Sequence, residues 1–201
     1  MPGFREQLAE QRWDDHRYYH HSLMNQSLHF LSACTFLAAY VLLLVSPAVA
    51  SLLAWGIAMT SRQAGHFFFE PKGYDHVNDA SHEHKEEIKV GYNLFRKVML
   101  MTLWALVPVV LLIEPTLFGT LVRPEGFADY LSHVGIGWLF LGVGAIAFRS
   151  TQLFFQRDVE TGLVWATKIL TDPFNDFKLY KSAPKRLLKG ERIDHHDAAA
   201  A

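Results

Sequence analysis

Histidine is concentrated in this sequence, with eleven among 201 residues. Neutral imidazole is the commonest metal ligand in proteins. His20, His29 and His66 lie beside two apolar stretches joined by a very short connection, and Glu70 follows His66 by one helical turn. Imidazole nitrogen with carboxylate oxygen is the ligand set favoured by non-haem Fe(II), and Zn(II) also accepts it. These residues predict a metal site for Fe(II), with Zn(II) as the alternative ion.

The spacing of neighbouring polar residues supports one shared site. Asn25 precedes His29 by four residues, and Gln63 and Glu70 lie three before and four after His66. Residues three or four apart lie on one face of an α-helix, so two adjacent helices can direct both sets at one another. We predict the histidines as ligands and Glu70 as a further ligand or an orienting group. Asn25 and Gln63 are expected to fix imidazole tautomers or to hold a substrate carboxylate.

Two further residues have expected roles beside this cluster. Arg62 is a candidate partner for a substrate carboxylate, because guanidinium groups bind carboxylates with two parallel hydrogen bonds. Gly65 has no side chain and permits close backbone approach next to His66. Taken singly, each polar residue at a helix end could instead hydrogen-bond to a neighbouring helix or a lipid headgroup. The convergence of several such residues favours a functional site.

The remaining histidines separate by position along the chain. His82 and His84 belong to the tract SHEHKEE, which is typical of a solvated helix face, and are secondary ligand candidates. His133 begins the fourth apolar stretch, at the opposite end of a predicted span of about 30 Å. We therefore expect His133 to be remote from the cluster.

Four apolar stretches are long enough to cross a bilayer as helices, which takes about 20 residues. Their tracts AAYVLLLV and LWALVPVVLLI have no polar face, which a helix of a soluble bundle would need. The predicted fold is all-α, a polytopic membrane protein with about four transmembrane helices in two hairpins plus interfacial amphipathic helices. The stretches cover about Ser27 to Val45, Pro47 to Phe69, Val98 to Phe118 and Val134 to Phe155.

These spans organise the chain as a single membrane domain over residues 1–201. Glycines in the fourth stretch, among them Gly135 and Gly142, are expected to allow close helix approach. The predicted parts are a cytoplasmic amphipathic segment (1–25), the first hairpin (26–70), a cytoplasmic loop (71–97), the second hairpin (98–156) and a cytoplasmic interfacial tail (157–201).

Basic residues are distributed unevenly about the predicted spans. If Arg62 and Arg149 extend toward the N-terminal side, every Lys and Arg except Arg123 lies on that side. This asymmetry is the positive-inside pattern and predicts cytoplasmic termini. The expected location is the inner membrane of a bacterium or the endoplasmic reticulum of a eukaryote.

The amino-acid composition limits which classes of binding partner are expected. The formal net charge is −1 and the basic residues are dispersed, so no nucleic-acid partner is expected. Cys34 is the single cysteine, which excludes an intrachain disulfide. The expected partners are the bilayer and a lipid or fatty-acid substrate, and the pattern is compatible with a homo-oligomer.

The segments YHHSLMNQSLHF and AGHFFFE resemble the 2-hydroxy-fatty-acid dioxygenase family of fungal endoplasmic reticulum and its small bacterial membrane relatives. That family shows His, then Asn, then Leu-x-His or Leu-His, and later Gly-His followed by a Phe-Glu pair. The resemblance covers about residues 18–71 and implies Fe(II)-dependent α-oxidation of a 2-hydroxy fatty acid, which is shortened by one carbon. The matching residues are His20, Asn25 and His29, then Gly65, His66, Phe69 and Glu70.

Two classes of function follow. The first is a metal-dependent membrane oxygenase acting on a 2-hydroxy fatty acid or related lipid, whose acyl chain extends between the helices. A di-iron hydroxylase or desaturase ranks lower, because His16, His20 and His21 imitate one histidine box and no comparable further boxes follow. The alternative is a non-catalytic membrane scaffold or assembly protein that binds a partner through its cytoplasmic loop and tail. Bound metal distinguishes the enzyme from the scaffold.

Overall fold

The computed structural model describes residues 3–70, 73–76, 78–88, 90–91 and 94–194. Within these ranges the regular structure is helical, and the only β-type pairings are two isolated bridges, which confirms the all-α prediction. The elements are α1 (Phe4–Tyr19), α2 (Leu23–Leu42), α3 (Pro47–Leu53), the π-helical segment η1 (Ala54–Met59), α4 (Thr60–Phe69), α5 (His82–Ile88), α6 (Leu94–Ile113), α7 (Phe127–Gln156), α8 (Val159–Tyr180) and α9 (Ala183–Leu188).

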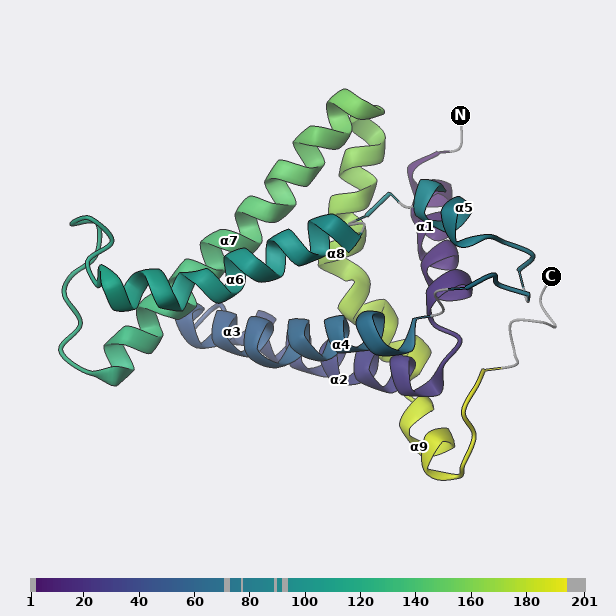
Figure 1. The fold of residues 1–201 in the computed structure, drawn as a ribbon, viewed down its shortest axis with the longest axis horizontal. Coiled ribbons are helices and arrows are strands. Elements are labelled where there is room, and N and C mark those ends of the chain that lie inside the picture. The colour runs from purple at the N-terminus through teal and green to yellow at the C-terminus, as the bar shows by residue number, and fades with distance from the viewer. Residues whose placement is uncertain (1–2, 71–72, 77, 89, 92–93, 195–201) are drawn as a thin grey trace.

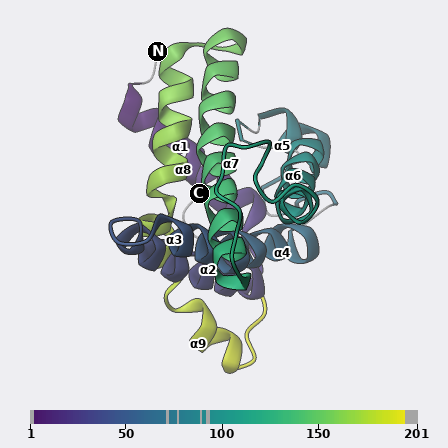
Figure 2. The same ribbon diagram turned by 90° about the vertical axis from the view of Figure 1, so that its left-hand side faces the viewer.

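Two sets of helices cross one another. The hairpin of α2 with α3, η1 and α4 runs lengthwise, and α6 runs in a similar direction above it (Figure 1). In the view turned by 90°, α6 is seen end-on while α1, α7 and α8 stand upright (Figure 2). The α1 and α5 helices lie at one end of the molecule and the α6–α7 connection lies at the other.

A short turn brings α2 alongside the second half of its hairpin. Ser46 N donates to Leu42 O at 2.7 Å and closes the end of α2. Pro47 then begins α3, a position where proline fits because its missing N–H would be unpaired in any helix. The predicted second span is therefore helical throughout, although η1 interrupts its α-helical pattern. π-Helical turns are rare and occur frequently at functional sites.

Two helices in the described part of the chain are long and apolar enough to cross a membrane: α7 and residues Phe95–Ile113 of α6. Only 11% of the most apolar window of α7 and 6% of that of α6 are buried within the protein, whereas the core helix of a soluble protein is mostly buried. The apolar side chains of Leu112 and Phe140 point outward, being 68% and 72% exposed. These two helices support membrane insertion. The other two predicted spans contain buried polar residues or the π-helical interruption.

Glycine permits α7 to pack closely against the hairpin. A Cβ at Gly135 would fall far inside contact distance of the Ala48 backbone in α3, so only glycine fits there. Gly137 likewise has no room for a Cβ beside Val107 of α6. The expectation of close approach is confirmed at these positions, whereas Gly144 faces open space.

The α8 helix integrates the predicted C-terminal tail into the fold. It packs against α1, α2 and α7. One face is apolar and half-exposed, with Leu170 and Phe174 at 50% and 52%, as an interfacial helix requires. The opposite face buries a polar stripe spaced by four residues, made up of Lys168, Asp172, Asp176 and Tyr180.

Candidate metal centre

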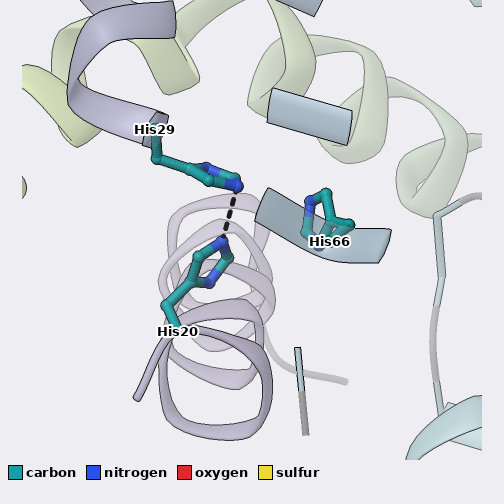
Figure 3. A group of neighbouring side chains, drawn as sticks. All are labelled: His20, His29 and His66. Carbon is teal, nitrogen blue, oxygen red and sulfur yellow. Dashed lines mark hydrogen bonds between the residues drawn. The ribbon is translucent and has the colours of Figure 1, made fainter. Parts of the chain in front are cut away.

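Three histidines from separate segments meet at one point. His20 lies in the connection between α1 and α2, His29 in the second turn of α2, and His66 in α4. One nitrogen from each ring lies within 4.8 Å of the others, and in the described chain they form the only such group of histidine, cysteine or carboxylate side chains. The rings gather around one point, with a dashed line between His20 and His29 (Figure 3).

The spacing of these nitrogens suits shared ligation. Two ligands on one ion, with bonds of about 2.0–2.1 Å, lie roughly 3–3.4 Å apart when they are adjacent in the coordination sphere. The Nε2 atoms of His20 and His29 are 3.1 Å apart. The three nitrogens lie within 4.8 Å of one another, so His66 would need to move by less than about 2 Å to close the triangle around such an ion. The predicted proximity of His29 and His66 is confirmed, because their ring centroids are 4.9 Å apart.

Oxygen atoms hold the Nδ1 atoms of two of these rings. His20 Nδ1 lies 2.7 Å from the backbone oxygen of Asp15, and His66 Nδ1 lies 2.7 Å from Oε2 of Glu70. Metal-binding histidines usually donate their second ring N–H to a carbonyl or carboxylate, which fixes the tautomer. This arrangement leaves the lone pair on Nε2. It favours the orienting role for Glu70 over the role of a further ligand.

The third ring faces a carboxylate from the C-terminal part of the chain. His29 Nδ1 lies 3.6 Å from Oδ2 of Asp176, slightly beyond hydrogen-bond distance. The same carboxylate accepts a 2.7 Å hydrogen bond from Arg62. Asp176 was not predicted as a site residue. The signal in the sequence was the four-residue spacing of polar side chains along an otherwise apolar helix.

Amide side chains hold the backbone that presents His20. Asn25 donates from Nδ2 to the carbonyl of Tyr19 at 2.7 Å, and Gln26 donates from Nε2 to the carbonyl of His20 at 2.8 Å. Asn25 thus lies in the site as predicted, where it secures backbone rather than an imidazole. Gln26 was not predicted, although it directly follows Asn25 in the same helical turn.

Burial keeps the imidazole of His20 neutral. Desolvation lowers the pKa of His20 well below its ordinary value, and neighbouring His29 acts in the same direction. Burial alone would raise the pKa of Asp15, but the ammonium of Lys168, 2.7 Å away, holds it well below its usual range. A neutral imidazole is the form that metal binding requires. The ionised carboxylate of Asp15 pairs with Lys168, and only the backbone oxygen of Asp15 contacts His20.

Gly65 provides the tightest contact in the cluster. A Cβ at this position would overlap Oδ1 of Asn25 and lie 3.4 Å from Cδ2 of His29. The expected need for glycine beside His66 is therefore confirmed.

We expect Gly65→Ala to destabilise the protein by about 1–3 kcal/mol, because the added methyl group must displace Asn25. It should also weaken metal binding, since Asn25 secures the backbone next to His20. Gly56→Ala is the matched control, as no atom lies within 4 Å of its Cβ position on the same hairpin. Thermal unfolding in detergent measures both variants. Equal midpoints would contradict the proposed contact.

The other predicted residues divide between the site and the surface. Gln63 lines the adjoining cavity, and its Oε1 is buried without a hydrogen-bond partner. Arg62 lines the same cavity but pairs with Asp176, so a substrate carboxylate would have to share its guanidinium. His82 and His84 are exposed on α5 and lie outside the cluster. They fit the solvated-face interpretation.

His133 lies near the far end of the hairpin, as expected. Two residues further along α7, Gly135 packs on Ala48 beside the α2–α3 turn. His29 is more than three helical turns from that turn, about 20 Å at 1.5 Å per residue. The absence of His133 from the cluster follows from this separation.

An apolar cavity of about 370 Å³ opens beside His66. Residues of α2, η1, α6, α7 and α8 supply its mostly apolar walls. Its charged and polar lining residues include the cations Arg62, Lys97 and Lys168, the carboxylates Asp14, Asp15 and Asp172, and Gln63 and His66. Ligand pockets typically combine such walls with a few convergent polar groups. The histidine cluster therefore adjoins a compartment suited to an amphiphile.

No known protein-family model, curated protein or solved structure matches this chain. The resemblance to the 2-hydroxy-fatty-acid dioxygenases therefore rests on the two sequence motifs.

Proposed function

We propose that this protein is a metal-dependent membrane oxygenase that uses Fe(II) to oxidise a 2-hydroxy fatty acid or a related lipid. The observation that carries the proposal is that His66, one of three clustered imidazoles, lines an apolar cavity. A metal site alone would fit many reactions. A metal site that adjoins an acyl-sized compartment fits a lipid substrate, and the two sequence motifs favour the 2-hydroxy acid.

The donor set fits a divalent transition metal. Three neutral imidazoles suit Fe(II) and Zn(II), and the oxygen partners of His20 and His66 are the outer hydrogen bonds expected of ligands. Bound Fe(II) would supply the reactivity toward O2, which Zn(II) lacks because it has no redox chemistry. His20, His29 and His66 would hold the ion, and Glu70 and Asp176 would orient two of them.

The overall reaction balances with O2 as the only oxidant. A 2-hydroxy acid and one O2 give a carboxylic acid one carbon shorter, one CO2 and one water. The residues around the cluster bind and orient the substrate in this proposal. The apolar walls exclude water from the head group, and the unpaired Oε1 of Gln63 can accept a hydrogen bond from the 2-hydroxyl.

The direct test is turnover by purified protein loaded anaerobically with Fe(II) and then exposed to O2. We expect a 2-hydroxy fatty acid to yield the acid one carbon shorter, and the Zn(II)-loaded protein to yield none. Absence of the shortened acid with Fe(II), over a series of chain lengths, would contradict the proposal.

We also propose four spans with cytoplasmic termini, supported by the distribution of basic residues and by the two strongly apolar helices. A cysteine replacing Glu125, in the α6–α7 connection, should react with an impermeant maleimide from outside the cell. A cysteine replacing Glu191, after α9, should react only after permeabilisation. Both variants are made in a Cys34→Ser background. Labelling of both from one side would refute this topology.

A further inference from the structure

We infer that the cavity is a tunnel for a single acyl chain, with the head group at His66 and the chain end beside Trp55 and Gly142. The placement of the head group rests on the proposed function. The tunnel is inferred from the lining of one cavity, which includes His66 and Arg62 of α4 as well as Trp55 of η1 and Gly142 of α7. The inference concerns the residues that set which chain lengths the protein accepts.

Fixed indole rings form the deep part of the wall. Trp55 is 6% exposed, and its Nε1 donates to the carbonyl of Trp138 at 2.8 Å. Trp138 in turn donates to the carbonyl of Trp104 at 2.9 Å. Hydrogen-bonded and buried aromatic rings have little freedom to move aside for a ligand. The deep wall is therefore a fixed boundary.

The dimensions fit one chain of moderate length. The helical path from His66 back to Trp55 rises about 16 Å at 1.5 Å per residue. An extended chain with carbon–carbon bonds near 1.5 Å advances about 1.25 Å per carbon and places about 13 carbons in that length. The cavity volume of about 370 Å³ corresponds to roughly a dozen methylene-sized groups of about 30 Å³, the volume of a water molecule in the liquid. One acyl chain accounts for this volume, so the expected occupant is a single-chain carboxylic acid.

Gly142 is the position most suited to limiting chain length. It lines the cavity, and a Cβ there would lie 3.5 Å from Nε1 of Trp55, in ordinary contact. A larger side chain would extend beyond that contact into the space beside the indole. Gly144 lies on the same helix but has no atom within 4 Å of its Cβ position and does not line the cavity. The same substitution at Gly144 is therefore a matched control.

The test measures binding to metal-free protein in detergent micelles, so that two-chain phospholipid is present only when it is added as a competitor. Hexadecanoic acid brominated at its last carbon is the probe, because bromine should quench the tryptophans at the deep end. Unbranched fatty acids of increasing length then compete with it. We expect wild-type affinity to peak at about 14–16 carbons, which is the tunnel length of about 13 carbons plus the head group.

Gly142→Leu should move this peak to chains about three or four carbons shorter. Affinity for the 16-carbon acid should fall at least tenfold, while affinity for the 10-carbon acid stays within twofold and reports an intact fold. Gly144→Leu should keep the wild-type profile. Trp55→Leu, which removes an indole ring from the wall, should move the peak toward longer chains.

Three results would overturn the tunnel: equal loss at all lengths in Gly142→Leu, the same shift in Gly144→Leu, or displacement of the probe by a two-chain phospholipid as effective as the acid. Failure of the oxygenase proposal looks different, because this binding needs neither metal nor O2. Length-dependent binding without turnover would leave the tunnel standing and refute the enzyme. Turnover without the Gly142→Leu shift would support the enzyme and refute the tunnel.

Discussion

We expect His66→Ala to abolish both stable Fe(II) binding and turnover of a 2-hydroxy fatty acid. The substitution removes one of three imidazoles whose nitrogens lie within 4.8 Å of one another. Loss of an outer hydrogen-bond partner typically costs about 10–100-fold in metal affinity or activity, so loss of a ligand should cost more than about 100-fold. Glu70→Gln should fall within the smaller range, because Glu70 contacts Nδ1 of His66. Metal content and product formation are measured on the same preparations.

Histidines outside the cluster supply the controls. His133→Ala and His84→Ala should retain metal and activity, since His133 is remote and His84 is exposed on α5. Wild-type activity in His66→Ala would refute His66 as a ligand. Loss of metal in His84→Ala would show instead that the loop containing α5 supplies a ligand.

The second large effect is expected at Asp176, where removal of the carboxylate should both destabilise the protein and weaken its metal binding. Asp176→Ala leaves the guanidinium of Arg62 without its 2.7 Å partner in a buried setting. Breaking a buried ion pair from one side costs about 3–5 kcal/mol. We expect a cost near the lower end of this range, because Asp172 remains 3.7 Å from Arg62 and still pairs with it. A loss of about 3 kcal/mol lowers the unfolding midpoint by roughly 6–12 °C in a chain of this size.

A double variant separates stability from site geometry. Arg62→Met combined with Asp176→Leu removes both charges and should recover much of the stability, because apolar replacements of a buried pair are often tolerated. Metal affinity should stay reduced, since His29 still lacks its carboxylate. Glu160→Gln, at an exposed position on the same helix, is the matched control. An unchanged midpoint in Asp176→Ala would show that this pair contributes nothing to stability.

Apolar patterning predicted the helices well and their ends less well. The third predicted span extended to Phe118, but α6 ends at Ile113 because Glu114 precedes Pro115, and a residue before proline disfavours helical geometry. The fourth was predicted from Val134, whereas α7 begins at Phe127. The first two turns of α7 contain polar residues, so a search for apolar runs does not detect them. The π-helical segment depends on tertiary packing and had no sequence signal.

The core of the candidate site was accessible from spacing alone. His29 and His66 lie on two helices joined by a short turn, so their proximity follows from chain connectivity. Asp176 was missed because its contact with His29 depends on how α8 folds back over α2, which local sequence does not specify. The stripe that contains Asp176 was nevertheless readable as polar residues at every fourth position of an apolar segment. Such a stripe in an apolar segment predicts a helix whose polar face is buried against the rest of the protein.

The most direct test of the central claim is the amount of metal bound per chain. Protein purified anaerobically is supplied with Fe(II), separated from free ion and analysed for iron alongside the combined His20→Ala, His29→Ala and His66→Ala variant. We predict one Fe(II) per chain in the wild type and none in the triple variant, with both proteins showing the same helical content. Absence of iron from the wild type, or equal iron in the triple variant, would contradict a metal centre formed by these three histidines.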